Sequence, residues 1–191
     1  MTFRTRFAPS PTGPLHLGHA YSAIIAHDMA RAAGGAFLLR MEDTDLQRSK
    51  PEWDAAIIED LTWLGLRWDE PILRQSEHLN DYNKYLKAFE SMGFLYPCSC
   101  SRGDIRAALS APQEGVSHDV YPGTCKNRPM SDRKPGDALR LHLDRALSRL
   151  KGQNVTFEET GAAHKGTHHL DPERSLQAIG DLVLSLSLLH I

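Results

Sequence analysis

The chain has 191 residues, and its 22 lysines and arginines against 24 aspartates and glutamates give a formal net charge of −2, which excludes a wholly basic nucleic-acid binder. Its composition, 41% hydrophobic and 24% charged, is typical of a globular protein and excludes a disordered chain. At roughly 150 residues per domain, the length fits one large domain or a domain that carries a smaller one.

Compartment and membrane partners are limited by the cysteines and by hydropathy. The cysteines are few and odd in number, and Cys98 and Cys100 are separated by a single residue, so a reducing compartment is favoured. No stretch approaches the roughly 18 consecutive apolar residues of a membrane span. We therefore expect a cytoplasmic protein without a membrane partner. We also expect it to be a monomer.

The N-terminal region alternates strand and helix patterns. Apolar and charged residues alternate over 3–7, which predicts a strand that stops at Pro9. Apolar residues then recur with helical spacing over 17–32, and a glycine pair at 34–35 closes this helix. Residues 36–41 predict a second, buried strand.

A second helix is predicted to open at Ser49, where the serine can cap it and Glu52 can reach back, and to end at Gly65. A third helix is predicted over 77–92. The order strand, helix, strand, helix implies a parallel sheet.

The remainder of the chain has a different composition. Residues 98–137 carry Gly, Pro, Ser, charges and all the cysteines with little periodicity, as expected of an inserted module. Residues 139–143 alternate like a strand, with which 155–158 could pair. Segment 160–175 is polar and is interpreted as a solvated loop. Its histidines, which we do not interpret as a metal site, are His164, His168 and His169.

The most informative stretch runs from Arg6 to His19. A strand that feeds a helix N-terminus presents free backbone N–H groups and the positive end of the helix dipole, which together bind anions such as nucleotide phosphates. His16 and His19 can donate hydrogen bonds there, and Gly18 allows close approach of a ligand. The alternative is a Pro/Gly loop with two incidental surface histidines.

Two motifs together carry a family resemblance. Residues 6–24, and then Arg40-Met-Glu-Asp-Thr-Asp45 with Arg48, resemble the class I glutamyl-tRNA synthetases, whose first signature has the HIGH form. The sequence His16-Leu-Gly-His19 and the later Cys-x-Cys look most like a short paralogous group that lacks the anticodon-binding domain. Members of that group activate glutamate with ATP and attach it to queuosine in the anticodon of tRNA(Asp).

The resemblance implies a fold class and domain limits. The expected fold is α/β, an incomplete Rossmann-like parallel-sheet catalytic domain with an inserted zinc-containing α+β module. Residues 1–96 would form the first half of the nucleotide-binding catalytic domain. Residues 97–178 would form the inserted module, which is similar to an acceptor-binding module, and 179–191 the truncated start of the return to the catalytic sheet.

Ligand-binding residues are likewise implied by the resemblance. Glutamate would be held by the strand end and by one acid, namely Arg6, Phe7, Ala8, Pro9, Ser10 and Glu42. ATP, with Mg, would be bound by Thr12, His16, Gly18 and His19, of which His16 and His19 would also be catalytic. The alternative for Arg6 and Glu42 is an ion pair across adjacent strands. Asp43, Asp45 and Arg48 are expected to hold the loop and the helix start.

A metal site is predicted around the cysteines. Cys98 and Cys100 can bind one zinc ion from a tight turn, and Cys125 can supply a third sulfur. From the residues alone, His118 is the default fourth ligand, whereas the resemblance points to Tyr121. The zinc would be structural, and the alternative is three free cysteines in a small core.

The resemblance extends to about Leu184. The aromatic residue, the arginine and the KMSKS-type loop of family members have no counterpart in residues 185–191, so we expect a truncated chain that has lost glutamate-dependent ATP–pyrophosphate exchange. Other interpretations are a fragment of an ordinary glutamyl-tRNA synthetase that charges tRNA(Glu), a nucleotidylyltransferase with an HxGH loop, and a non-catalytic zinc-containing fragment that binds tRNA. Basic residues that could contact phosphates are Arg102, Arg106, Lys126, Arg128, Arg133 and Lys134.

Overall fold

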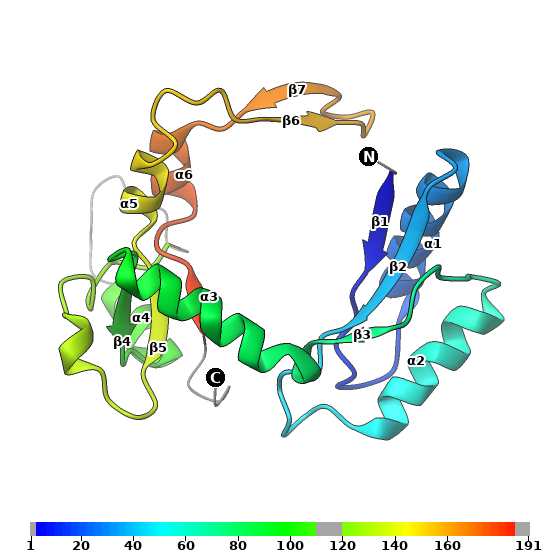
Figure 1. Ribbon diagram of the computed structural model, residues 1–191, viewed down its shortest axis with the longest axis horizontal. Helices are drawn as coiled ribbons and strands as arrows, with labels where there is room; N and C mark the ends of the chain where they lie inside the picture. The colour runs from blue at the N-terminus through cyan, green and yellow to red at the C-terminus, as the bar shows by residue number, and fades with distance from the viewer. Residues whose placement is uncertain (1–2, 110–119, 186–191) are drawn as a thin grey trace. The chain divides into compact units, whose positions relative to one another are not determined.

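The computed structural model describes residues 3–109 and 120–185 (Figure 1). The chain divides into two compact units, of which the first runs to Tyr82 and the second begins at Asn83. Within the described ranges, no helix has the length and apolar character needed to cross a membrane.

The first unit contains a parallel sheet in the order β1-β2-β3, as the alternation of strands and helices predicts. Arg4 is the register partner of Ala36, and Arg40 is the register partner of Leu73. The elements are β1 (Arg4–Phe7), α1 (Leu17–Ala32), β2 (Ala36–Met41), α2 (Pro51–Trp63), β3 (Leu73–Arg74) and a 3₁₀ turn (Gln75–His78).

The core of this unit is built on alternate residues of β2. Phe37, Leu39 and Met41 are almost completely buried, whereas the residues between them are half-buried. Both helices pack against this face. They contribute Ala23, Ala30, Ile57 and Leu61, and Phe7 and Leu66 complete the cluster.

Most of the larger apolar side chains of α1 do not face the core, and Ile24 alone among them packs against it in the described residues. Leu17 and Tyr21 are 85% and 68% exposed, and Ile25 and Met29 are exposed as well. The helix instead packs through Ala23 and Ala30, whose small side chains allow the backbone to approach the sheet. Apolar spacing therefore predicted the helix, but the residues of α1 that are fully buried are alanines.

The turn after α1 gives a matched test of two glycines. Gly34 has φ +59° with open space at the Cβ position, whereas a Cβ on Gly35 would lie 2.1 Å from the Phe3 carbonyl oxygen. That oxygen accepts a hydrogen bond from Ala36 N–H. We expect Gly34→Ala to cost about 1 kcal/mol and Gly35→Ala more than about 3 kcal/mol in the free energy of unfolding, because the second must displace backbone. Equal denaturation midpoints for the two variants would contradict this packing.

The start of α2 differs from the prediction. Lys50, not Ser49, is the N-cap residue, no side chain caps the helix, and Pro51 occupies its first turn. Proline lacks one of the N–H groups that have no partner at a helix start, and its fixed φ suits the first turn, so Pro51 marks the start of this helix. The Ser49 hydroxyl is buried with no hydrogen-bond partner among the described residues.

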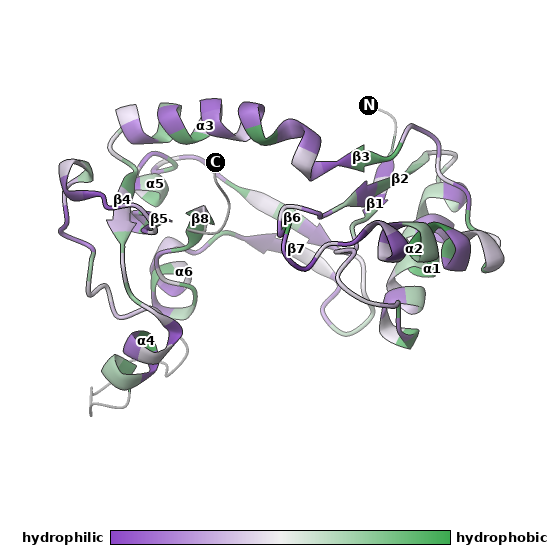
Figure 2. Cartoon of the chain, turned by 90° about the horizontal axis from the view of Figure 1, so that it is seen from below, coloured by the Kyte–Doolittle hydropathy of each residue, from purple (hydrophilic) through white to green (hydrophobic). Residues whose placement is uncertain are grey.

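The second unit has its own antiparallel sheet in the order β4-β5-β8 and a separate hairpin β6-β7. Helix α3 (Leu79–Ser91) begins just before the unit border, and apolar and polar residues alternate along it (Figure 2). The other elements are β4 (Leu95–Cys98), α4 (Arg102–Leu109), a 3₁₀ turn (Met130–Asp132), β5 (Ala138–Leu141), α5 (Leu143–Ser148), β6 (Thr156–Glu159), β7 (Gly166–His169), α6 (Pro172–Ala178) and β8 (Val183–Ser185).

Strand pairing in this unit corrects two predictions. Strand β6 pairs with β7, not with β5, so segment 160–175 is not simply a loop, because His168 and His169 lie on a strand. Strand β8 pairs antiparallel with β5, and no pairing of β8 with the parallel sheet is present in the described part of the chain. The predicted limit at 96/97 falls inside β4, and the predicted domain limits remain a prediction.

Candidate active site and metal site

The loop between β1 and α1 places both signature histidines at the helix N-terminus. His16 is the N-cap residue of α1, and its Nδ1 accepts a hydrogen bond from Gly18 N–H at 3.1 Å. His16 N–H donates in turn to Nδ1 of His19 at 3.3 Å. The two rings are stacked, with centroids 3.7 Å apart. The histidines therefore form a reciprocal cap instead of two incidental surface residues.

These bonds determine which ring nitrogen carries the proton. A nitrogen that accepts a backbone N–H bond is unprotonated, so each neutral ring carries its proton on Nε2. Burial, and secondarily the neighbouring His16, lowers the pKa of His19 below its ordinary value. His19 is therefore a neutral donor at neutral pH, and its Nε2–H can bind an anion without prior protonation.

The His16–His19 contact predicts a measurable titration. His16→Asn keeps a capping acceptor but removes the imidazole charge, so the pKa of His19 should rise toward its ordinary value while remaining lowered by burial. An NMR pH titration of the His19 ring checks this. His27→Asn, on the same helix, is the control and should leave the pKa of His19 unchanged. An unchanged pKa in His16→Asn would show that the charge of His16 does not act on His19.

Gly18 has a packing role as well as the predicted access role. A Cβ at Gly18 would lie 3.1 Å from the His16 ring. Glycine therefore leaves room for the imidazole that caps the helix.

The residues predicted to bind glutamate are partly brought together. Pro9 O accepts a hydrogen bond from Glu42 N–H at 2.9 Å, so the end of β1 adjoins the segment after β2. The Glu42 carboxylate pairs through Oε1 with Arg40 at 2.5 Å, not with Arg6. Within the described residues, the exposed Arg6 guanidinium has neither an ion pair nor a hydrogen bond, so it can receive a carboxylate.

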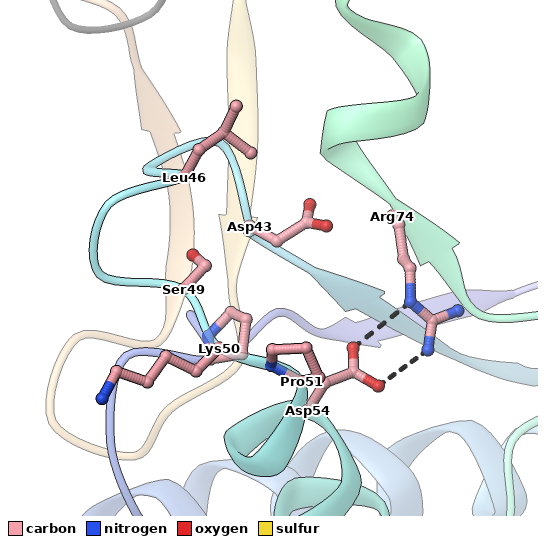
Figure 3. A pocket seen from close by; sticks show the side chains of 8 residues that line it. Asp43, Leu46, Ser49, Lys50, Pro51, Asp54 and Arg74 are labelled. Carbon is pink, nitrogen blue, oxygen red and sulfur yellow. Dashed lines mark hydrogen bonds and ion pairs between the residues drawn. The ribbon is translucent and has the colours of Figure 1, made fainter.

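The segment after β2 borders a cavity of about 300 Å³ in which the charged groups are already paired (Figure 3). Arg74 donates two hydrogen bonds to Asp54, and the Asp43 carboxylate accepts bonds from Ser76 N–H and Oγ. Asp45 pairs with Arg48 at 2.6 Å. The prediction that Asp43, Asp45 and Arg48 hold the loop is confirmed.

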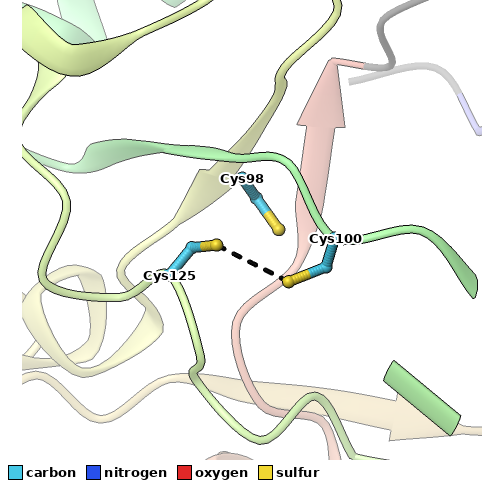
Figure 4. Close-up of side chains that lie close together, drawn as sticks. All are labelled: Cys98, Cys100 and Cys125. Carbon is cyan, nitrogen blue, oxygen red and sulfur yellow. Dashed lines mark hydrogen bonds between the residues drawn. The ribbon is translucent and has the colours of Figure 1, made fainter. Parts of the chain in front are cut away.

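In the second unit, the cysteines converge from two segments (Figure 4). The sulfurs of Cys98, Cys100 and Cys125 lie within 4.8 Å of one another, with Cys100 Sγ 3.5 Å from Cys125 Sγ. Tyr121 Oη lies 3.4 Å from Cys98 Sγ and 3.7 Å from Cys100 Sγ. A tetrahedral zinc ion with bonds of about 2.3 Å to sulfur and about 2.0 Å to oxygen needs edges of about 3.8 Å and about 3.5 Å. These three cysteines could hold a metal ion, and Tyr121 lies where a fourth ligand would lie.

The surroundings fix Tyr121 and activate one thiol. Cys125 N–H donates to Tyr121 Oη at 2.9 Å, and the Arg140 guanidinium lies 3.6 Å from the centroid of the Tyr121 ring. Burial raises the pKa of Cys125, but hydrogen bonds from Ser99 N–H and from neighbouring side chains outweigh it and lower that pKa to about 7. His118 lies outside the described residues.

Sequence reasoning missed a buried polar cluster that includes Lys126, the residue after Cys125. The Asp181 carboxylate accepts hydrogen bonds from Tyr96 Oη at 2.8 Å and from Leu143 N–H at 2.9 Å, and it pairs with Lys126 at 3.1 Å. Arg140 donates to the Asp181 carbonyl. Asp181 lies 85 residues from Tyr96, and only the pattern Gly180-Asp181 before a strand hinted at it.

The fold and the paired histidines define a class. The family model described as "tRNA synthetases class I (E and Q), catalytic domain" matches residues 2–150, and the chain belongs to this family. The resemblance and the α/β fold class predicted from sequence are thereby confirmed. Among similar curated proteins, one from Rhodobacter capsulatus named glutamyl-Q tRNA(Asp) synthetase is 54% identical over 188 residues, which cover 95% of this chain and 66% of that protein.

Other relatives place the chain in the same family. A glutamate–tRNA ligase of Hydrogenobaculum sp. is 46% identical over 160 residues, or 82% of this chain and 33% of that protein. The crystal structure of a glutamate tRNA ligase from Elizabethkingia meningosepticum in complex with its amino acid superposes with a TM-score of 0.68 at 25% identity and covers 99% of this chain and 39% of that one. The chain thus spans between about a third and two thirds of the length of these relatives.

Proposed function

We propose that this chain serves ATP-dependent activation of glutamate and transfer of the glutamyl group to queuosine in the anticodon of tRNA(Asp). The observation that carries this is the pair of Nε2–H donors on His16 and His19 at the N-terminus of α1. The Arg6 guanidinium on β1, which is exposed and has no ion pair or hydrogen bond among the described residues, adds a group that can bind a carboxylate. The 54% identical relative named glutamyl-Q tRNA(Asp) synthetase supports the choice of tRNA.

The proposed first step needs positioning and charge stabilisation. The glutamate carboxylate attacks the α-phosphorus of ATP and pyrophosphate leaves, so negative charge builds on phosphate oxygens. His16 and His19 donate to these oxygens, and Thr12 and Gly18 border the nucleotide, which binds with Mg. A nucleophile on the tRNA then attacks the carbonyl carbon of the resulting glutamyl–AMP anhydride, the bond from that carbon to the phosphate oxygen breaks, and AMP leaves.

Glutamate recognition would use the end of β1 and the segment after β2. Arg6 binds a substrate carboxylate, and residues 7–10, Phe7, Ala8, Pro9 and Ser10, line the backbone path of the ligand. Glu42 meets the substrate ammonium, because only its Oε1 is engaged by Arg40 and Oε2 is left for the ligand.

The metal of the second unit is proposed to be a structural zinc ion, held by Cys98, Cys100, Cys125 and Tyr121. It would supply cross-links between the segment after β4 and the loop 121–125 and would take no part in glutamyl transfer. The cytoplasm, where thiols remain reduced, is the proposed place of action.

Calorimetric titrations with ATP and with glutamate test the first step. The chain should bind both, and Arg6→Gln should weaken glutamate binding at least 10-fold because the carboxylate loses a bidentate partner. Arg4→Gln is the matched control on the same strand, since Arg4 already pairs with Glu70 at 3.1 Å. Failure to bind either ligand would favour a non-catalytic tRNA-binding fragment instead.

Filter binding tests the choice of tRNA. The chain should bind tRNA(Asp) that contains queuosine more tightly than the same tRNA without it. Preference for tRNA(Glu) would favour an ordinary glutamyl-tRNA synthetase, the name carried by the Hydrogenobaculum relative.

A further inference from the structure

A concave basic surface adjoins the metal site in the second unit. It is a cavity of about 540 Å³ lined by Ser99, Arg128, Ser131, Asp132, Arg133 and Lys134, which we call the basic pocket. Three cationic side chains face one carboxylate there, so the pocket has an excess of positive charge.

The floor of the basic pocket is fixed by Arg128. Its guanidinium donates to Asp137 at 2.9 Å, to the Asp132 carbonyl at 2.8 Å and to Ser99 Oγ at 3.3 Å. The Asp137 side chain is 3% exposed and also accepts a hydrogen bond from Lys134 N–H at 2.8 Å. The loop that carries the pocket is therefore wrapped around a largely buried ion pair, which holds its shape before any ligand binds.

The rim of the basic pocket carries uncommitted charge. The side chains of Arg133 and Lys134 are exposed and form no hydrogen bond or ion pair with any described residue. The Asp132 carboxylate is engaged by Ser131 Oγ at 3.2 Å. Two free cations on a rigid loop, beside the hydroxyl of Ser99, suit a tetrahedral oxyanion with several acceptor oxygens.

The basic pocket is also linked to the cysteine cluster. Ser99 lies between Cys98 and Cys100, and its backbone N–H donates to the Cys125 sulfur, which Arg128 also contacts. A metal ion that orders the cysteines would thereby order the pocket floor.

From these observations we propose that the basic pocket binds a backbone phosphodiester of the tRNA. The proposal rests on the proposed function, which supplies the RNA, and adds a contact site at the metal-bearing module. Phosphate contacts position RNA without reading its sequence, so this site contributes affinity and placement and leaves recognition of queuosine to other contacts.

Filter binding of tRNA(Asp) at several salt concentrations tests the site. Arg133→Gln with Lys134→Gln should weaken binding about 5-fold or more near 0.1 M salt and reduce the slope of log K against log salt by about one to two. Lys87→Gln with Lys151→Gln is the control, because it removes the same charge from exposed positions of the same unit outside the pocket. Metal content, the far-UV spectrum and ATP affinity should be unchanged in both variants.

The outcomes separate this site from the proposed function. If the unmodified chain binds tRNA and the pocket variant binds with the same affinity and salt slope, the site is wrong and the proposed function stands. If both double variants lose affinity equally, binding depends on net charge and the site is again wrong. If the unmodified chain binds no tRNA but binds an acidic protein through Arg133 and Lys134, both proposals are overturned.

Discussion

Replacing Cys125 by serine is expected to abolish tight metal binding and to destabilise the second unit by several kcal/mol. Structural zinc contributes roughly 10–16 kcal/mol of apparent binding free energy in small zinc-dependent folds, and binding to the folded state alone adds directly to stability. Metal analysis should find one equivalent of zinc per chain in the wild type and almost none in the variant, with a melting temperature lower by more than about 10 °C.

Chelation is the internal control for this prediction. The wild-type chain stripped of metal should melt at the temperature of Cys125→Ser, and the chelator should not change the melting of Cys125→Ser. A variant that melts like the metal-loaded wild type would show that the three cysteines are free thiols in a small core.

The fourth ligand can be assigned with two conservative variants. Tyr121→Phe keeps the ring on Arg140 but removes the oxygen, so zinc affinity should fall at least 10-fold while stoichiometry at saturating zinc is retained. His118→Ala should leave the affinity unchanged. The reverse pattern would assign His118 as the ligand and leave Tyr121 as a packing residue.

Local patterns predicted the first two strands and the first two helices of the first unit, but not the two-residue strand β3. The strand over 36–41 matches β2, and the helix over 17–32 matches α1, because alternation and a terminal glycine pair are properties of adjacent residues. The buried face of α1 was not evident, since a helix that approaches a sheet closely uses alanines such as Ala23 and Ala30, which carry little hydrophobic signal.

Pairing between distant segments was harder to predict. Residues 155–158 alternate as a strand does, but alternation does not name a partner, and the hairpin with β7 was missed because His168 and His169 are polar. The same limit applies to the sites. The anion-binding loop was visible as one continuous stretch, whereas the reciprocal cap of His16 and His19 and the burial of Asp181 emerge only from three-dimensional packing.

Asp181→Ala is expected to destabilise the second unit by about 3–5 kcal/mol, the usual cost of removing one partner of a buried charged cluster. Its side chain is 5% exposed, and the change would leave Tyr96 Oη and Leu143 N–H without their acceptor. Asp144→Ala is the matched control, because Asp144 pairs with the same Lys126 at 3.1 Å but is 47% exposed. That variant should lose less than about 1 kcal/mol. Urea denaturation of both variants measures the difference. Similar losses would mean that Asp181 acts only as a surface counter-ion of Lys126. The buried cluster would then not be what holds the segment before β8 and the loop around Cys125 together.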